Sequence, residues 1–251
     1  MNKQQKNGSR GIEWCTHTWN PISGCQHQCR WQMPDGNIAI CYAEAVANGV
    51  AKDAYPHGFE HHYYNPERIA EPRKLKRPAR IFIDSMSDLF GAWVPEQQIK
   101  SILSICAQCD WHTFLVLTKN APRLLKFADQ CPDNLHAGVS MPPDSMLGKS
   151  LSRHQQESML RRSLQVLDTL PRNLITWMSF EPLSWDVAPI LNQYPTAIRW
   201  AVIGAASNGR TYYQPNSEHV NHLLDVLDEN NIPVFFKGNL KWDARREEYP
   251  E

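Results

Sequence analysis

Six short apolar segments recur along the chain, and each is followed by a cluster of polar residues. They begin at Ile81, Thr113, Leu135, Ile175, Arg199 and Pro233, and a seventh candidate lies within residues 13–20. The stretches between them carry apolar residues three and four positions apart, which is the spacing of an amphipathic helix. These helical stretches begin at Pro95, Ala121, Arg153 and Asn216.

Strands that are apolar throughout and alternate with helices are typical of a parallel sheet covered by helices. We therefore predict an α/β fold, namely a partial (β/α) TIM-like barrel of about six or seven parallel strands with a cysteine-bearing loop near the N terminus. No Gly/Ser-rich linker, internal repeat or low-complexity tract divides the sequence. Residues 1–251 are thus expected to form one domain with short polar tails.

The composition excludes several classes of protein. Apolar residues make up 42% of the chain and charged residues 21%, which allows a packed core and excludes an entirely disordered chain. Basic and acidic residues number 26 each, so the bulk charge gives no argument for nucleic-acid binding. No apolar run reaches the roughly 18 residues of a membrane helix, and no apolar stretch follows the basic start, so we expect a cytoplasmic protein with no membrane association.

Three of the seven cysteines lie close together in the sequence. Three residues separate Cys25 from Cys29, and a Pro-Asp-Gly turn at 34–36 is suited to bring Cys41 back beside them. Three thiolates that converge in this way hold an iron-sulfur cluster or a zinc ion. An odd number of cysteines without a secretory signal also favours free thiols or metal ligands over disulfides.

The spacing of these cysteines does not choose the metal. Cys15 or His27 would complete a four-ligand zinc site, and three unconnected buried thiols are a further alternative. Cys106 and Cys109 form a C-x-x-C pair, but they keep the apolar spacing of the helical stretch that begins at Pro95. We expect that pair to pack in the core.

Polar side chains follow most of the predicted strands. Because the carboxyl ends of parallel strands meet at one edge of a sheet, we expect these side chains to form one polar pocket. The candidates for catalysis are Lys119, Glu181 and Lys237, and the candidates for cofactor binding are Ser85, Ser87, Asp88, Ser140, Ser207 and Asn208. Helix capping is the alternative role for several of these residues.

Two segments suit contact with nucleic acid. Residues 55–68 carry His57, His61 and His62 among aromatic side chains that are able to stack on a base, and the last two histidines are also candidate metal ligands. The run that begins at Arg68 carries six basic residues against one acidic residue, which suits phosphate contacts. A solvated loop and a solvated helix face are the alternatives.

Longer motifs extend over nearly the whole chain. They are WNPISGC, CYAE, IFIDSMSDLF, TFLVLTKNAPR, GVSM, SFEPL, WAVIGAASNG and VFFKGN, in that order. In these motifs the chain resembles a phage and prophage-associated family of uncharacterised proteins that is grouped with the radical SAM barrels. The resemblance implies a partial barrel whose first loop binds a four-iron four-sulfur cluster through three cysteines, with S-adenosylmethionine on the unique iron. Cys25, Cys29 and Cys41 are then the ligands.

The sequence departs from the usual radical SAM pattern at two places. The usual spacing is C-x3-C-x2-C, whereas eleven residues separate Cys29 from Cys41, so an insertion must loop out without displacing the third thiolate. The glycine-rich strand end that usually receives the methionine amino group is missing, and SMSD at 85–88 takes its place. Our hypothesis is that Asp88 or Ser85 accepts this ammonium through charge-assisted hydrogen bonds.

Two functions from different classes follow. The first is a radical SAM-like iron-sulfur enzyme that reductively cleaves S-adenosylmethionine to a 5′-deoxyadenosyl radical, with an external electron donor. Its substrate is unknown, and the basic run, the histidine-rich segment and the phage association favour nucleic acid or a nucleotide. The second is a non-catalytic barrel with a structural zinc site that binds a nucleotide or a partner. Metal-assisted hydrolysis at the strand ends is a third function, but the His-rich spacing expected for it is missing.

Overall fold

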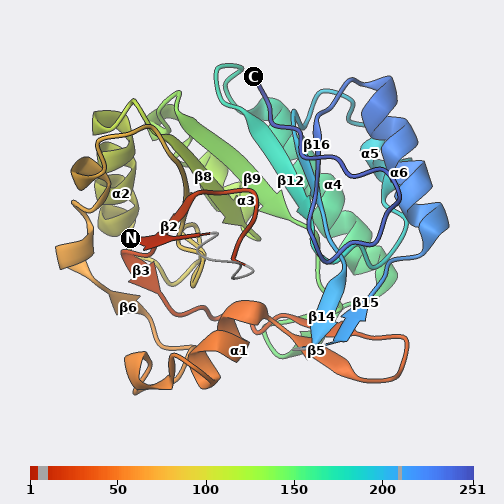
Figure 1. Cartoon of the computed structure of the whole chain (residues 1–251), viewed down its shortest axis with the longest axis horizontal. Coiled ribbons are helices and arrows are strands. Elements are labelled where there is room, and N and C mark those ends of the chain that lie inside the picture. Colours follow the sequence, from red (N-terminus) through yellow and green to blue (C-terminus); the bar gives the residue numbers. More distant parts are fainter. Residues whose placement is uncertain (5–10, 209–210) are drawn as a thin grey trace.

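The computed structural model describes residues 1–4, 11–208 and 211–251. Its centre is an eight-stranded sheet that curls into part of a barrel (Figure 1). In spatial order the strands are β1 (Asn2–Lys3), β2 (His17–Trp19), β7 (Arg80–Ile83), β8 (Thr113–Thr118), β9 (Leu135–Ser140), β12 (Thr176–Phe180), β13 (Ala201–Ile203) and β16 (Val234–Phe236). Strand β1 is antiparallel to β2, and the other neighbours in this sheet are parallel. The predicted partial α/β barrel is confirmed, including the strand within 13–20.

Helices cover the outer face of the sheet (Figure 1). They are α2 (Glu96–Gln108), α3 (Ala121–Leu125), α4 (Arg153–Thr169), α5 (Ala188–Leu191) and α6 (Ser217–Glu229). Helix α1 (Tyr42–Asn48) lies instead at the edge formed by the carboxyl ends of the strands. The 3₁₀ turns are η1 (Lys52–Ala54), η2 (Pro66–Arg68), η3 (Pro72–Lys74) and η4 (Ala128–Gln130). Helix α6 is capped by Asn216, whose side chain accepts a hydrogen bond from the amide of Glu218. Helix α4 begins with a capping box between Ser152 and Gln155. Within the described residues, no helix combines the length and apolar character needed to cross a bilayer.

Two apolar cores follow from the alternation of side chains along the strands. One face of the sheet packs against the helices, and Cys106 and Cys109 lie in this core as expected. The other face lines the inside of the barrel and carries Trp14, Phe82, Trp177, Trp200 and Phe235. The rings of Trp14 and Trp177 meet edge to face with centroids 5.2 Å apart. This aromatic cluster packs inside the barrel below the carboxyl ends of the strands.

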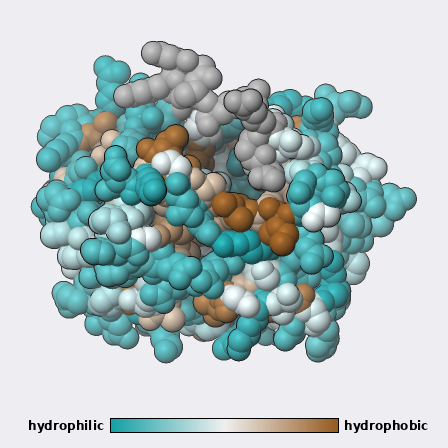
Figure 2. Space-filling view, turned by 90° about the horizontal axis from the view of Figure 1, so that it is seen from below, coloured by the Kyte–Doolittle hydropathy of each residue, from teal (hydrophilic) through white to brown (hydrophobic). Residues whose placement is uncertain are grey.

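Short strand pairs extend the barrel at these carboxyl ends. They are β3 (Ile22–Ser23) with β6 (Tyr63–Tyr64), β4 (Arg30–Gln32) with β5 (Ile38–Ile40), β10 (Ser145–Met146) with β11 (Lys149–Ser150), and β14 (Ala206–Asn208) with β15 (Thr211–Tyr213). Strand β4 also pairs with β10, and the Tyr213 hydroxyl donates to Asp35 at 2.7 Å. Figure 1 shows β5, β14, β15 and α1 together along one edge. Figure 2 looks onto this edge, where apolar side chains gather near the middle of a largely hydrophilic face.

Candidate functional site

The eleven residues between Cys29 and Cys41 form a β-hairpin. Strand β4 starts directly after Cys29 and β5 ends directly before Cys41, and Arg30 pairs with Ile40 across the hairpin. The turn at 34–36 is closed by the Met33 amide, which donates to the Asn37 carbonyl at 2.8 Å. Because the two strands are in register, the hairpin returns the chain to its starting point. The insertion therefore places Cys41 opposite Cys29 instead of separating them.

The three cysteines line one small cavity of about 90 Å³. Cys29 is buried, and Cys25 and Cys41 are partly exposed. Burial raises the pKa of Cys25 well above its ordinary value and that of Cys29 to about 11, although Lys119 lowers the latter in part. Both thiols therefore hold their protons at neutral pH in the metal-free protein. Metal binding has to displace these protons, as it does for any cysteine ligand.

The donor set of the cavity consists of three cysteines with one histidine beside them. Four ligands around one zinc lie within about 4 Å of one another, and within the described residues no group of three His, Cys, Asp or Glu side chains is arranged to hold one metal ion. Cys15 lies in the core beside Trp14, and its thiol donates to the Ile12 carbonyl. The His27 Nε2 atom is occupied by Asp88 at 2.8 Å. Cys15 is thus not poised as a fourth zinc ligand, whereas His27 lines the cysteine cavity and its buried Nδ1 atom has no hydrogen-bond partner in the described residues. Three cysteines on one cavity also suit an iron-sulfur cluster.

Residues 85–88 hold the cysteine loop in place. The Met86 carbonyl accepts from the Gly24 amide at 2.9 Å, and the Ser87 hydroxyl donates to the Gly24 carbonyl at 2.6 Å. The Ser85 carbonyl accepts a hydrogen bond from the hydroxyl of Tyr42, the residue that follows Cys41. This segment therefore contacts the chain next to the first and the last of the three cysteines.

The carboxylate of Asp88 is buried, and both of its oxygens accept hydrogen bonds from other residues of the protein. Its Oδ1 accepts from the Phe90 amide at 3.0 Å, and its Oδ2 accepts from His27 Nε2 and from the Lys119 amide at 2.9 Å. Burial alone would raise the pKa of Asp88, but the hydrogen bond and charge of His27 hold it below its ordinary value. Asp88 thus connects the cysteine loop to the ends of β7 and β8.

We expect Asp88→Asn to weaken retention of the cluster, because the amide replaces one acceptor by a donor that faces His27 or the Lys119 amide. The chelator concentration that removes half of the bound iron should fall about tenfold, as for other residues that orient metal ligands. Asp186→Asn is the matched control, since Asp186 pairs with His222 at 2.9 Å outside the cavity. Normal iron retention with weaker S-adenosylmethionine binding would contradict this role and favour the ammonium hypothesis instead.

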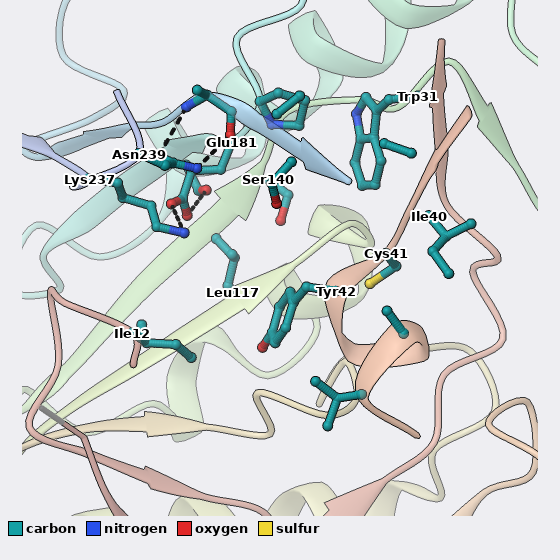
Figure 3. Close-up of a pocket in the computed structure, with 18 of the residues that line it drawn as sticks. Ile12, Trp31, Ile40, Cys41, Tyr42, Leu117, Ser140, Glu181, Lys237 and Asn239 are labelled. Carbon is teal, nitrogen blue, oxygen red and sulfur yellow. Dashed lines mark hydrogen bonds and ion pairs between the residues drawn. The ribbon is translucent and has the colours of Figure 1, made fainter. Parts of the chain in front are cut away.

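A larger pocket of about 520 Å³ adjoins the cysteine cavity. The two spaces share Cys41, Tyr42, Phe82, Leu117, Lys119 and Ser140 in their walls. Figure 3 shows this pocket, with Cys41, Tyr42 and Trp31 on one side, Glu181, Lys237 and Asn239 on the other, and Ser140 between them. The structure therefore brings together the ends of β8, β9, β12 and β16, which is the convergence that the sequence predicted.

The predicted site residues divide between the two spaces. Lys119 and Ser140 line both, whereas Ser85, Ser87 and Asp88 line the cysteine cavity and Glu181, Ser207 and Lys237 line the larger pocket. Asn208 lies in β14, and its side chain is outside the part of the structure that is described. The roles given to these residues stay predictions.

Lys119 lies where the two spaces meet. Burial alone would lower the pKa of its ammonium, but Cys29, Cys41, Asp88 and Cys25 raise it overall. The side chain therefore stays charged at neutral pH. Within the described part of the chain, the ammonium of Lys119 forms no hydrogen bond or ion pair, and its electrostatic partners are the cysteines and Asp88. It is available to an anionic group of a ligand that enters the pocket.

Two aromatic residues of the pocket were not predicted from the sequence. Tyr42 and Trp31 line its wall, and the indole Nε1 of Trp31 is buried without a partner in the described residues. Trp31 lies in the inserted hairpin, where its alternation with polar neighbours on β4 was the available signal. Tyr42 follows Cys41 directly in the CYAE motif, so its position beside the site was readable from the motif itself.

The two segments expected to contact nucleic acid take different positions. The ring of Tyr63 contacts both His57 and His61, and His62 bonds to Gln98, so these histidines belong to a packed loop. The basic run ends at Arg80, which starts β7 at the opposite end of the barrel from the pocket. The run therefore leads away from the pocket, and its residues line neither the pocket nor the cysteine cavity.

Comparison with known proteins gives a family. A family model for a protein of unknown function, DUF5131, matches residues 9–249. The chain belongs to this family. Among curated proteins, none matches the sequence.

The fold is also found in solved structures of spore photoproduct lyase. Its complex with dinucleoside spore photoproduct aligns with a TM-score of 0.55 at 9% identity, over 94% of this chain and 80% of the lyase chain. A double mutant with bound AdoMet and dinucleoside spore photoproduct aligns with a TM-score of 0.56 at 10% identity, over 91% of this chain and 78% of the lyase chain. At this level of identity the likeness shows a shared fold and no more.

Proposed function

We propose that this protein is a radical SAM-type iron-sulfur enzyme that acts on a nucleotide or nucleic acid. The observation that carries the proposal is the placement of Cys25, Cys29 and Cys41 on one cavity that opens into a pocket at the strand ends. The AdoMet and dinucleoside bound by the lyase of the same fold support it. The phage association, the single domain, the cytoplasmic location and an external electron donor remain predictions from the sequence.

The residues of the chain have separable tasks in this function. Cys25, Cys29 and Cys41 would hold a four-iron four-sulfur cluster. The chemistry that this group supplies is the reductive cleavage of S-adenosylmethionine to methionine and a 5′-deoxyadenosyl radical. The charged Lys119 is the group at the cluster side of the pocket that would bind a carboxylate.

Other residues shape the pocket and exclude water from it. Trp14 and Phe82 close the side toward the barrel core, since both are buried and belong to the aromatic cluster inside the sheet. The ion pair of Glu181 and Lys237 faces the pocket on its far side. A recessed, largely apolar space of this kind protects a reactive radical from solvent.

Metal analysis of the anaerobically reconstituted protein tests the proposal. We expect about four irons and four sulfides per chain, little zinc, and formation of 5′-deoxyadenosine after addition of S-adenosylmethionine and dithionite. Omission of dithionite is the control. Stoichiometric zinc without iron, or a full cluster that never yields 5′-deoxyadenosine, would overturn it.

A further inference from the structure

Glu181 and Lys237 form a polar site at the end of the pocket that lies opposite the cysteine cavity. Glu181 follows β12 and Lys237 follows β16, the two strands that flank β13, and their Oε1 and Nζ atoms are 3.0 Å apart. The Ser179 hydroxyl donates to the other carboxylate oxygen at 2.9 Å. Figure 3 shows this pair facing the same space as Cys41 and Tyr42.

A glycine between the two strands makes room for the pair. Gly204 follows β13, and a Cβ added there would lie 3.1 Å from Cδ of Lys237 and 3.2 Å from Cγ of Glu181. The two long side chains therefore cross over the end of β13, where any larger residue would press on both. Asn239 lines the same pocket, and its amide group exchanges hydrogen bonds with the backbone of Ala205, the residue after Gly204.

The charge balance of the pair determines which ligand it suits. The side chain of Glu181 is 16% exposed and that of Lys237 is 28% exposed, so neither charge is fully screened by water. Because the two charges cancel, an anion such as phosphate would gain from Lys237 and lose nearly as much to Glu181. A neutral ligand with a donor beside an acceptor gains from both, since Lys237 keeps spare N–H groups and Glu181 keeps spare lone pairs.

The surrounding walls are apolar and partly flat. Phe82, Leu117 and Pro182 line the same pocket, and the indole of Trp14 lies beside Phe82 with ring centroids 4.7 Å apart. Planar heteroaromatic rings combine a flat apolar face with an edge of adjacent donors and acceptors. A nucleobase has this combination, whereas a sugar or a phosphate lacks the flat face.

We propose that the Glu181–Lys237 pair binds the hydrogen-bonding edge of an uncharged nucleobase and rejects phosphate. This inference rests on the function proposed above. It specifies which part of the substrate binds at the far end of the pocket. Lys237 donates to a carbonyl or ring nitrogen of the base, and Glu181 accepts from the neighbouring N–H. The phosphates of the substrate then lie outside this end of the pocket.

The test is a binding measurement on the full-length protein, made with and without the reconstituted cluster. Calorimetric titration with the four ribonucleosides and with ribose 5-phosphate separates the base from the phosphate. The wild type should bind at least one nucleoside at least about tenfold more tightly than ribose 5-phosphate, because hydrogen bonds to charged groups are the stronger ones. Failure of S-adenosylmethionine cleavage would leave this result intact and would count against the proposed reaction only.

Variants at the pair give an effect that a merely structural role would not give. Glu181→Gln should lower nucleoside affinity about tenfold and raise ribose 5-phosphate affinity, because Lys237 loses its neutralising partner. Lys237→Met should lower nucleoside affinity without any gain for the phosphate. Glu229→Gln is the control, since Glu229 is exposed at the end of α6 that leads away from the pocket.

Three results would overturn the proposal. One is equal affinity of the wild type for nucleosides and ribose 5-phosphate. The second is unchanged nucleoside binding in Lys237→Met. The third is full competition by saturating S-adenosylmethionine, which would assign this end of the pocket to the cofactor. Lys237→Met is tested independently of Glu181→Gln. The proposal can therefore still be refuted if the Glu181 variant fails to fold.

Discussion

Replacement of Cys25, Cys29 or Cys41 by alanine, one at a time, is expected to abolish cluster binding and the cleavage of S-adenosylmethionine. All three thiols face a single cavity, and a cluster bound through three cysteines loses a third of its protein ligands in each variant. We expect at least about a hundredfold loss in the yield of 5′-deoxyadenosine, which exceeds the usual effect of residues that only orient ligands. Iron and sulfide content after reconstitution is the direct measurement.

The control is a buried cysteine outside the cavity. Cys131→Ala removes a thiol that donates to the Phe127 carbonyl beneath α3, so it costs some stability but should leave iron content unchanged. Retention of full iron content in any of the three cavity variants would show that this residue is not a ligand. Retention in all three would remove the basis of the proposed function.

Gly24→Ala is expected to destabilise the protein and to lower its iron content. Gly24 has a φ of +85°, and a Cβ at this position would lie 1.8 Å from the carbonyl oxygen of His61. The neighbouring carbonyl is backbone and cannot swing away as a flexible side chain would. Either the segment around His61 or the loop that carries Cys25 must move, and the bonds of Gly24 to Met86 and Ser87 would then be lost.

We expect a loss of about 3 kcal/mol or more in the free energy of unfolding of Gly24→Ala, measured by urea denaturation. Gly36→Ala is the matched control, because Gly36 has a φ of +82° but no atom within 4 Å of an added Cβ. Its cost is limited to the left-handed backbone, about 1–2 kcal/mol. Equal losses in the two variants would mean that the contact with His61 has no effect on stability.

The fold of the barrel could be predicted because its signals are local. Strands buried on both faces are apolar throughout, as IFI at 81–83 and TFLVLT at 113–118 show, and the helices between them keep the spacing of one buried face. The order in which strands and helices alternate then favours a parallel sheet. The same reasoning placed Lys119, Glu181 and Lys237 at one edge, because each follows a strand.

The short strand pairs around the pocket were not predicted. Strands of two or three residues such as β4 and β5 are too short for a pattern of alternation to stand out. Their pairing also depends on contacts between distant segments, for example Arg30 of β4 with Ser145 of β10. The turn at 34–36 indicated that the chain returns Cys41 toward Cys29, and the hairpin of β4 and β5 does so, but the pairing of this hairpin with β10 was decided by the tertiary structure.

The sequence by itself determined the residues available for chemistry, the strand ends that carry them and the class of fold. The tertiary structure decided which of these residues meet. Asp88 bonds to His27 and to the Lys119 amide, and Glu181 pairs with Lys237 over Gly204, although all of these contacts join separate strands or loops. The physical reason is that side-chain partners depend on the spatial order of strands and on the space between them, and neither quantity is encoded in local periodicity.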